Sequence, residues 1–203
     1  ARAMADRKPV IIVTAGMPRS GSTWLFNAAR LLLEGAGKPT HAAWVEDYDP
    51  ADPAGHHLVK VHFESHLTFE PDVTLTTWRP FEECLASLVR MRWLDTDAEA
   101  IRARYRHQKA VYDHWAARTD REIDFADIVG APEAAIAGIA EALALPADAA
   151  ARRRIAAALQ ALPAPENGPY DKTTLLHPGH RATDPDDYLM SPAEVRAIIA
   201  DLL

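Results

Sequence analysis

Residues 14–24, TAGMPRSGSTW, place two glycines, an arginine and several hydroxyl side chains between two apolar runs. A glycine-containing turn between a strand and a helix commonly holds phosphate, because its N–H groups and the helix N-terminus attract an anion. Gly16, Gly21 and Thr23 fit the phosphate-loop pattern G-x-x-x-x-G-K-[ST], but Ser22 stands at the lysine position. The loop is therefore predicted to bind phosphate without the side chain that reaches the β- and γ-phosphates of a triphosphate. The alternative is a tight turn that binds nothing.

Two other segments carry basic residues in an apolar context. Lys60 and His62 alternate within HLVKVHF, so on a strand both side chains would lie on one face. Arg79 follows VTLTTW at the predicted end of a strand, where ligands of open α/β sheets bind. Ser87 comes eight residues later, about two turns along a helix. Arg79 and Ser87 are candidates for a second phosphate site, although each segment alone also fits an ordinary solvated surface.

The elements that must position these residues alternate between strands and helices, which predicts an α/β fold with a mainly parallel sheet flanked by helices. Runs of β-branched and apolar residues predict strands at 10–13, 57–63, 73–78 and 122–125. Amphipathic or alanine-rich segments predict helices at 22–34, 80–93, 97–117, 132–144 and 147–161, with a last helix opened by the capping box of Ser191 and Glu194.

Two segments lack such periodicity. Residues 38–56 contain three prolines and the acidic run WVEDYDP, and predict a loop or a flap over the site. Residues 163–190 are rich in proline, histidine and aspartate, and predict an irregular loop or lid. No composition change marks a linker, so residues 1–203 are interpreted as one domain. Its first eight residues are expected to be disordered, with Met4 the natural start.

The composition limits the partners. A formal net charge of -7 disfavours a broad nucleic-acid interface, which needs a basic face. The one cysteine, Cys84, lies in a helical pattern and is interpreted as a buried apolar side chain. Neither a signal peptide nor an apolar run of membrane-spanning length is recognisable, so we expect a cytoplasmic protein without membrane contacts. The histidines at 56, 57, 62 and 66 lack the spacing of a zinc site, and no metal is expected.

Taken together, these segments resemble the sulfotransferases that use 3′-phosphoadenosine-5′-phosphosulfate (PAPS). That family carries a P-[KR]-[ST]-G-[ST]-[ST]-W loop, a K-T-H strand and an R-x-P-x₅-S segment. This chain has PRSGSTW at 18–24, KVH at 60–62 and RPFEECLAS at 79–87, with the proline one position early. IDFADIV at 123–129 resembles the family's Y-E-D-L segment, with Phe125 at the tyrosine position.

The resemblance implies a P-loop-like three-layer fold and direct transfer of a sulfuryl group from PAPS to a hydroxyl or amine of a small acceptor, without a metal. PAPS has no triphosphate chain, which would explain a loop without the lysine. His62 would be the general base, and Lys60 and Arg19 would stabilise the leaving 3′,5′-ADP. The implied donor-binding residues include the loop, the second phosphate site and the adenine wall: Pro18, Arg19, Ser20, Gly21, Ser22, Thr23, Trp24, Arg79, Ser87 and Phe125.

One family segment, R-K-G near the C-terminus, is missing. The stretch LLHPGHRATDPDDYL at 175–189 stands in its place. Its His177, Gly179, His180 and Arg181 are interpreted either as a substitute lid over the 3′-phosphate or as an ordinary loop.

Two other functions remain open at this stage. A small-molecule phosphotransferase or nucleotide kinase would need a lysine in the loop and an acidic metal ligand at a strand end, where this chain has Ser22 and Arg79. A non-catalytic adenine-nucleotide-binding protein would have no use for Lys60 and His62. Neither the acceptor nor the oligomeric state can be inferred from these residues.

Overall fold

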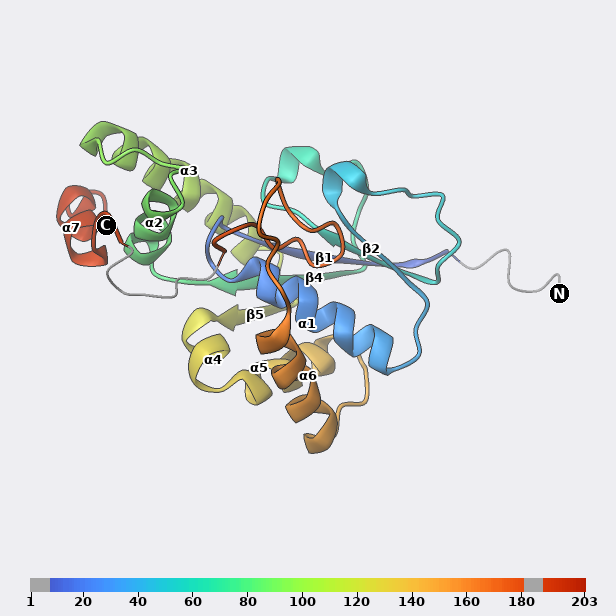
Figure 1. Cartoon of the computed structure of the whole chain (residues 1–203). Coiled ribbons are helices and arrows are strands. Elements are labelled where there is room, and N and C mark those ends of the chain that lie inside the picture. Colours follow the sequence, from blue (N-terminus) through green and yellow to red (C-terminus); the bar gives the residue numbers. More distant parts are fainter. Residues whose placement is uncertain (1–7, 181–187) are drawn as a thin grey trace, which may run out of the picture.

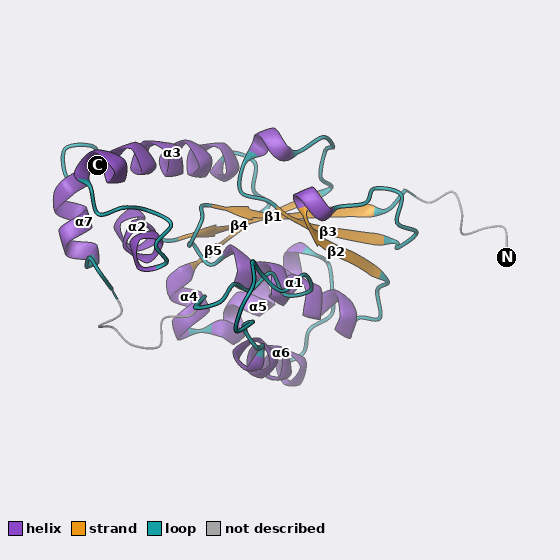
Figure 2. Cartoon of the chain, turned by 45° about the horizontal axis from the view of Figure 1, so that its top comes forward, coloured by secondary structure: helices purple, strands orange, loops and turns teal. Residues whose placement is uncertain are grey.

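A five-stranded parallel sheet forms the centre of the computed structural model, which describes residues 8–180 and 188–203. The strand order is β2-β3-β1-β4-β5, and every pairing is parallel. Helices cover both faces, so the fold has three layers (Figures 1 and 2). The strands are β1 (Val10–Gly16), β2 (Thr40–Trp44), β3 (His56–Lys60), β4 (Val73–Trp78) and β5 (Arg121–Asp124).

Helices α1, α5 and α6 lie on one side of the sheet and α3 on the other, while α2 and α7 pack together beyond the carboxyl ends of the strands (Figures 1 and 2). The α-helices are α1 (Ser22–Gly35), α2 (Phe81–Arg90), α3 (Ala98–Ala116), α4 (Phe125–Gly130), α5 (Pro132–Ala142), α6 (Ala149–Ala161) and α7 (Pro192–Ile199). Two short 3₁₀ turns, η1 (Val45–Asp47) and η2 (Glu64–His66), follow β2 and β3. No helix in the described part of the chain is both long and apolar enough to cross a bilayer.

Apolar packing on both faces explains why β1 reads as a continuous hydrophobic run. Leu25, Phe26 and Leu33 of α1 are buried on one face, in a cluster that includes Ile12. Val13 packs on the other face in a cluster with Cys84 and Trp115. Cys84 is fully buried in this apolar cluster, as interpreted from the sequence. Burial raises the pKa of its thiol to about 12.

The expected elements are largely present, with three corrections. The strand predicted at 57–63 ends at Lys60, so His62 lies in the turn after β3 and not on the strand. Residues 38–56 are not all loop, because Thr40–Trp44 forms the edge strand β2 against β3. An edge strand is only half buried, so it lacks the apolar run by which β1 was recognised. The predicted strand at 122–125 extends one residue too far. Asp124 ends β5 and its side chain caps α4, so Phe125 opens a helix. The capping box of Ser191 and Glu194 is confirmed.

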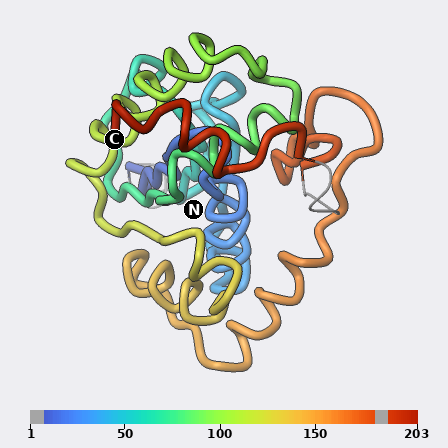
Figure 3. Tube along the Cα trace, turned by 90° about the vertical axis from the view of Figure 1, so that its left-hand side faces the viewer, coloured from blue at the N-terminus to red at the C-terminus, as the bar shows by residue number. Residues whose placement is uncertain are grey.

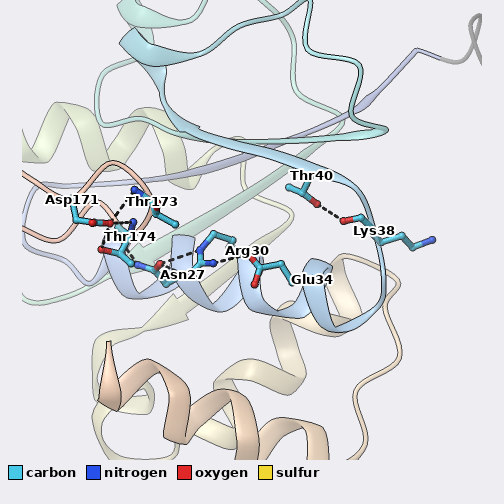
Figure 4. A network of polar contacts seen from close by, with 8 residues as sticks. All are labelled: Asn27, Arg30, Glu34, Lys38, Thr40, Asp171, Thr173 and Thr174. Carbon is cyan, nitrogen blue, oxygen red and sulfur yellow. Dashed lines mark hydrogen bonds and ion pairs between the residues drawn. The ribbon is translucent and has the colours of Figure 1, made fainter. Parts of the chain in front are cut away.

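The segment after α6 is irregular over its described residues, as predicted, but it is anchored. Asp171 Oδ1 accepts hydrogen bonds from the N–H groups of Thr173 and Thr174, and the Thr174 carbonyl accepts one from Asn27 Nδ2 of α1 at 2.7 Å (Figure 4). Figure 3 views the molecule from the carboxyl ends of the strands and shows this segment beside α1. Residues far apart in sequence are thereby brought to one end of the sheet.

Candidate functional site

The loop between β1 and α1 lies where the strand order reverses. β1 is the central strand, and the chain passes to β3 on one side and β4 on the other. Open α/β sheets bind ligands in the crevice at such a switch point, outside the carboxyl ends of the strands. The predicted phosphate loop therefore occupies the position at which the fold itself favours binding.

The loop is a tight turn whose glycines are required. Gly16 and Gly21 have φ of 142° and 102°, and a Cβ at Gly16 would lie 2.7 Å from Thr77 Oγ1. Ser20 is fully buried and its hydroxyl contacts the Met17 carbonyl and Thr77 Oγ1 at 2.7 and 2.6 Å. Ser20 thus shapes the loop from below. Arg19 also adopts a left-handed backbone, with φ of 73°.

The N-terminus of α1 has no side-chain cap. Gly21 is its N-cap residue, so the first helical N–H groups lack partners within the helix. Such groups attract an anion, and the helix dipole adds to that attraction. The hydroxyl of Thr23, in this first turn, accepts a hydrogen bond from Lys60 Nζ at 2.9 Å.

A cavity of about 530 Å³ opens beside this helix terminus. Most of the predicted site residues line it, although they come from six separate parts of the chain. They are Pro18, Arg19, Gly21, Ser22, Thr23, Trp24, Lys60, His62, Arg79, Ser87, Phe125, His177 and His180. Of the other predicted residues, Ser20 lies beneath the loop, Gly179 is not in the lining, and Arg181 is outside the described residues.

Four cationic side chains line this cavity: Arg19, Lys60, Arg79 and Arg90. Within the described residues only Arg79 pairs with a carboxylate, Glu83, at 3.0 Å. No described residue of the lining is acidic. Because a partly buried charge needs compensation, this end of the sheet is suited to an anionic ligand.

The same crowding shifts the pKa values of the two innermost cations. Burial, together with the neighbouring charge of Arg19, lowers the pKa of Lys60 to about 7. Burial, Arg90 and Arg79 lower the pKa of Arg19 to about 10. An anion bound among these groups would raise both values again.

Arg19 and Arg79 are held in place by different partners. Arg19 Nε donates to Ser87 Oγ at 3.0 Å and its Nη2 to the His180 carbonyl at 2.7 Å. Arg79 Nη1 donates to the Arg19 carbonyl at 3.1 Å, and its guanidinium carbon lies 4.0 Å from the centre of the Phe125 ring. Ser87 thus contacts Arg19, not the arginine with which the sequence pattern pairs it.

His62 lies just beyond the end of β3 and has a defined tautomer. Its Nδ1 lies 2.7 Å from the Gly16 carbonyl, which can only accept, so Nδ1 donates and Nε2 keeps a lone pair. Trp115 Nε1 fixes the backbone by donating to the His62 carbonyl at 2.8 Å. Burial, and then the charge of Lys60, lower the pKa of His62 to about 3. The neutral ring is chemically able to accept a proton.

One part of the cavity lining is apolar. It comes from the first turn of α1, from α4, from α6 and from the anchored segment: Trp24, Ile128, Val129, Leu159, Leu162 and Leu176. A mainly apolar pocket with a few convergent polar groups is typical of a small-molecule site.

Three further residues lie at this end of the molecule without a sequence motif that predicts them there. Arg90 lies one turn beyond Ser87 on α2 and donates to the Gly179 carbonyl at 3.2 Å. Its spacing of three residues from Ser87 was the available signal. Trp93 lies 5.8 Å from the Arg19 guanidinium carbon and Trp44 lies 5.5 Å from Lys60 Nζ. Trp44 was missed because β2 was interpreted as a loop.

Comparisons with known proteins give no family for this architecture. No family model matches the chain, and no curated protein matches it either.

Proposed function

We propose that this protein is a sulfotransferase that moves the sulfuryl group of PAPS to a small acceptor. One observation carries the proposal. Arg19, Lys60, Arg79 and Arg90 share a cavity with the neutral His62, and no described residue of that lining is acidic. PAPS is a compact polyanion that carries phosphate at two separate positions, which suits the four cations. A histidine with one unprotonated nitrogen can accept the proton that the acceptor hydroxyl loses.

The 5′-phosphosulfate would bind at the loop, to the free N–H groups at the start of α1 and to Arg19 and Lys60. The 3′-phosphate would bind on the other side of Arg19, where Arg79 and Arg90 supply charge. Adenine would lie against the apolar wall with Trp24. The switch-point loop and the strand order β2-β3-β1-β4-β5 also support assigning the sheet to the P-loop class of three-layer folds.

In the proposed reaction, an acceptor oxygen attacks the sulfur in line with the leaving phosphate. The new O–S bond forms as the bond from sulfur to the phosphate oxygen breaks, and His62 Nε2 takes the acceptor proton. Lys60 and Arg19 stabilise the negative charge on the departing 3′,5′-ADP. Because their positions are preset by Thr23, Ser87 and the His180 carbonyl, little reorganisation accompanies the transfer.

The alternative function, a phosphotransferase, requires a cavity lining of the opposite charge near the loop. It needs a carboxylate near the loop to position Mg²⁺, and the described lining offers cations there. A non-catalytic nucleotide-binding protein would account for the arginines, but it gives no role to the tautomer of His62.

The test is calorimetric titration with 3′,5′-ADP and, in parallel, with ADP plus Mg²⁺. We expect metal-independent binding of 3′,5′-ADP that weakens strongly in Arg79→Ala. Preference for ADP with Mg²⁺ would overturn the proposal in favour of the phosphotransferase. Binding of 3′,5′-ADP without any consumption of PAPS in the presence of a panel of alcohols, phenols and amines would favour the non-catalytic alternative.

A further inference from the structure

A second cavity of about 350 Å³ adjoins the first. The two share five lining residues: Pro18, Lys60, His62, Trp93 and His177. His62 and Lys60 therefore face both spaces. In a transfer reaction such a shared wall is where two reactants meet, so the second cavity is the place for the acceptor if the first holds the donor.

Aromatic side chains dominate the walls of this second cavity. Trp44, Phe63, Trp93 and Tyr170 line it together with the two shared histidines. The Trp44 ring lies 5.4 Å from the ring of His62 and 5.5 Å from Lys60 Nζ, which fixes it beside the proposed reacting atoms. Tyr170 is held by its hydroxyl, which donates to Asp47 Oδ2 at 2.8 Å. These walls favour a flat aromatic acceptor, because ring faces pack on ring faces and edges.

The lining also holds a cation whose partner is missing. Arg104 of α3 is partly buried, and its guanidinium makes no hydrogen bond or ion pair with any described residue. The other basic residues near it on α3 differ, since Arg102 pairs with Asp201 and Lys109 with Asp113. Glu46, the one acidic residue of the described lining, is exposed to solvent and comes from η1. The unpaired guanidinium of Arg104 lies in a largely apolar cavity, so it favours a negatively charged ligand more strongly than the exposed Glu46 disfavours one.

We propose that the acceptor is a phenol with a carboxylate substituent. The phenol ring packs among Trp44, Phe63 and Trp93, its hydroxyl meets His62 Nε2, and its carboxylate pairs with Arg104. This assignment rests on the proposed sulfotransferase function and names the substrate class of the same site.

The chemistry of His62 agrees with a phenol. Its depressed pKa makes His62 a weak base, which removes a proton more readily from an acidic hydroxyl than from a weakly acidic one. A phenol ionises near pH 10, whereas an aliphatic alcohol does so only in far stronger base. The bound donor raises the basicity of His62 but leaves this ranking unchanged.

The experiment compares three acceptors that differ in one substituent: 3-(4-hydroxyphenyl)propionate, its primary amide and 4-(2-aminoethyl)phenol. Each is assayed for kcat/KM with PAPS, and each is titrated into the complex of the protein with 3′,5′-ADP. We expect kcat/KM for the carboxylate to exceed that for the amide by about 10- to 100-fold, the usual range for a hydrogen-bonded charge. The amine should be the poorest acceptor.

Two variants locate the effect. Arg104→Gln should remove the difference between the carboxylate and the amide, whereas Arg106→Gln, an exposed arginine on the same helix outside the lining, should leave it intact. A preference for the amine over the carboxylate, or equal losses for the carboxylate and its amide in Arg104→Gln, would overturn the acceptor assignment alone. If 3′,5′-ADP does not bind the unaltered protein, the proposed function falls as well, so the two failures are distinguishable.

Discussion

Strand β3 carries buried polar side chains at both of its ends, and the two ends treat them differently. At the amino end His57 is fully buried, with Nδ1 at 2.7 Å from the Tyr48 hydroxyl and Nε2 at 3.1 Å from the Asp52 carbonyl. At the carboxyl end Lys60 is 5% exposed, and among the described residues its ammonium has a single hydrogen-bond partner, the Thr23 hydroxyl. The polar group at the amino end is fully hydrogen-bonded within the fold, whereas the ammonium at the carboxyl end is not.

Under the proposed function, the difference is one between a structural polar group and a functional one. A buried group with all its hydrogen bonds made contributes to a unique fold. A buried charge beside other charges of the same sign lowers stability, and such an arrangement is typical of a binding or catalytic site. His57 and His62 are therefore a matched pair for mutation. Both are histidines at or next to β3, but both ring nitrogens of His57 have hydrogen-bond partners, whereas only Nδ1 of His62 has one among the described residues.

The largest expected effect comes from His62. His62→Ala should lower the rate of sulfuryl transfer by about 10²- to 10⁴-fold, the usual contribution of a general base, and should change 3′,5′-ADP affinity little. His57→Ala should instead lower the melting temperature and leave the turnover of the folded protein intact. Initial rates with PAPS, calorimetry and thermal unfolding measure the three quantities. Normal turnover in His62→Ala would remove its role as base.

A second comparison uses two arginines. Arg19→Gln should weaken 3′,5′-ADP binding by about 10- to 100-fold through loss of a charge-assisted contact. Arg30→Gln is the control, because Arg30 is nearly buried on α1 but pairs with Glu34 and Asn27 (Figure 4). It should reduce stability without changing affinity. Equal losses of affinity in both variants would mean that binding follows global stability and not the cavity charges.

Lys60 should show opposite effects on binding and stability. Its pKa is lowered from 10.5 to about 7, so between these values the unfolded chain holds a proton that the folded one lacks. Stability of the unliganded protein should rise with pH across this window, and the burial cost is fully present below pH 7. Lys60→Met should therefore raise the melting temperature by several degrees at pH 6 and lose that advantage towards pH 10.

The same variant should remove a pH effect on ligand binding. A phosphate ligand favours the charged form of Lys60, so 3′,5′-ADP affinity should be highest below pH 7 and fall above it, with proton uptake on binding. Calorimetry in buffers of different ionisation enthalpy detects that proton. An unchanged pH profile in Lys60→Met would show that another group is responsible.

The smallest effect is expected at the satisfied end of β3. Tyr48→Phe removes the hydroxyl next to His57 Nδ1 and leaves one buried ring nitrogen unpaired. Such a loss costs about 1–3 kcal/mol of unfolding free energy, with no change in nucleotide affinity. Denaturant unfolding measures the free energy of unfolding, and titration with 3′,5′-ADP measures the affinity. A weaker affinity in Tyr48→Phe would contradict the claim that the amino end of β3 has a purely structural role.

The secondary structure was predictable where local pattern and burial agree. β4 was predicted with its observed bounds because both of its faces are buried in a parallel sheet. β2 was missed because an edge strand pairs on one side only, and its position depends on β3, not on its own residues. The end of β5 was misplaced because Phe125 fits a strand by propensity, whereas Asp124 acts as a helix cap.

The residues of the candidate site were predictable from the sequence, but the hydrogen bonds between them were not. The loop, Lys60, His62 and Arg79 were found from short motifs, and the fold brings them to one cavity. The partner of Ser87 was not predictable, because its hydrogen bond to Arg19 joins positions 68 residues apart that no local pattern relates. Arg104 was equally hidden, since only the packing of α3 shows that a cation on a basic helix face lines a cavity.

The hydrogen bond from Arg19 to the His180 carbonyl joins positions 161 residues apart. Ribosomes add about 5–20 residues each second, so for several seconds an emerging chain holds its phosphate loop without this contact. A nucleotide that binds as proposed therefore meets the complete site only after residue 180 has been synthesised.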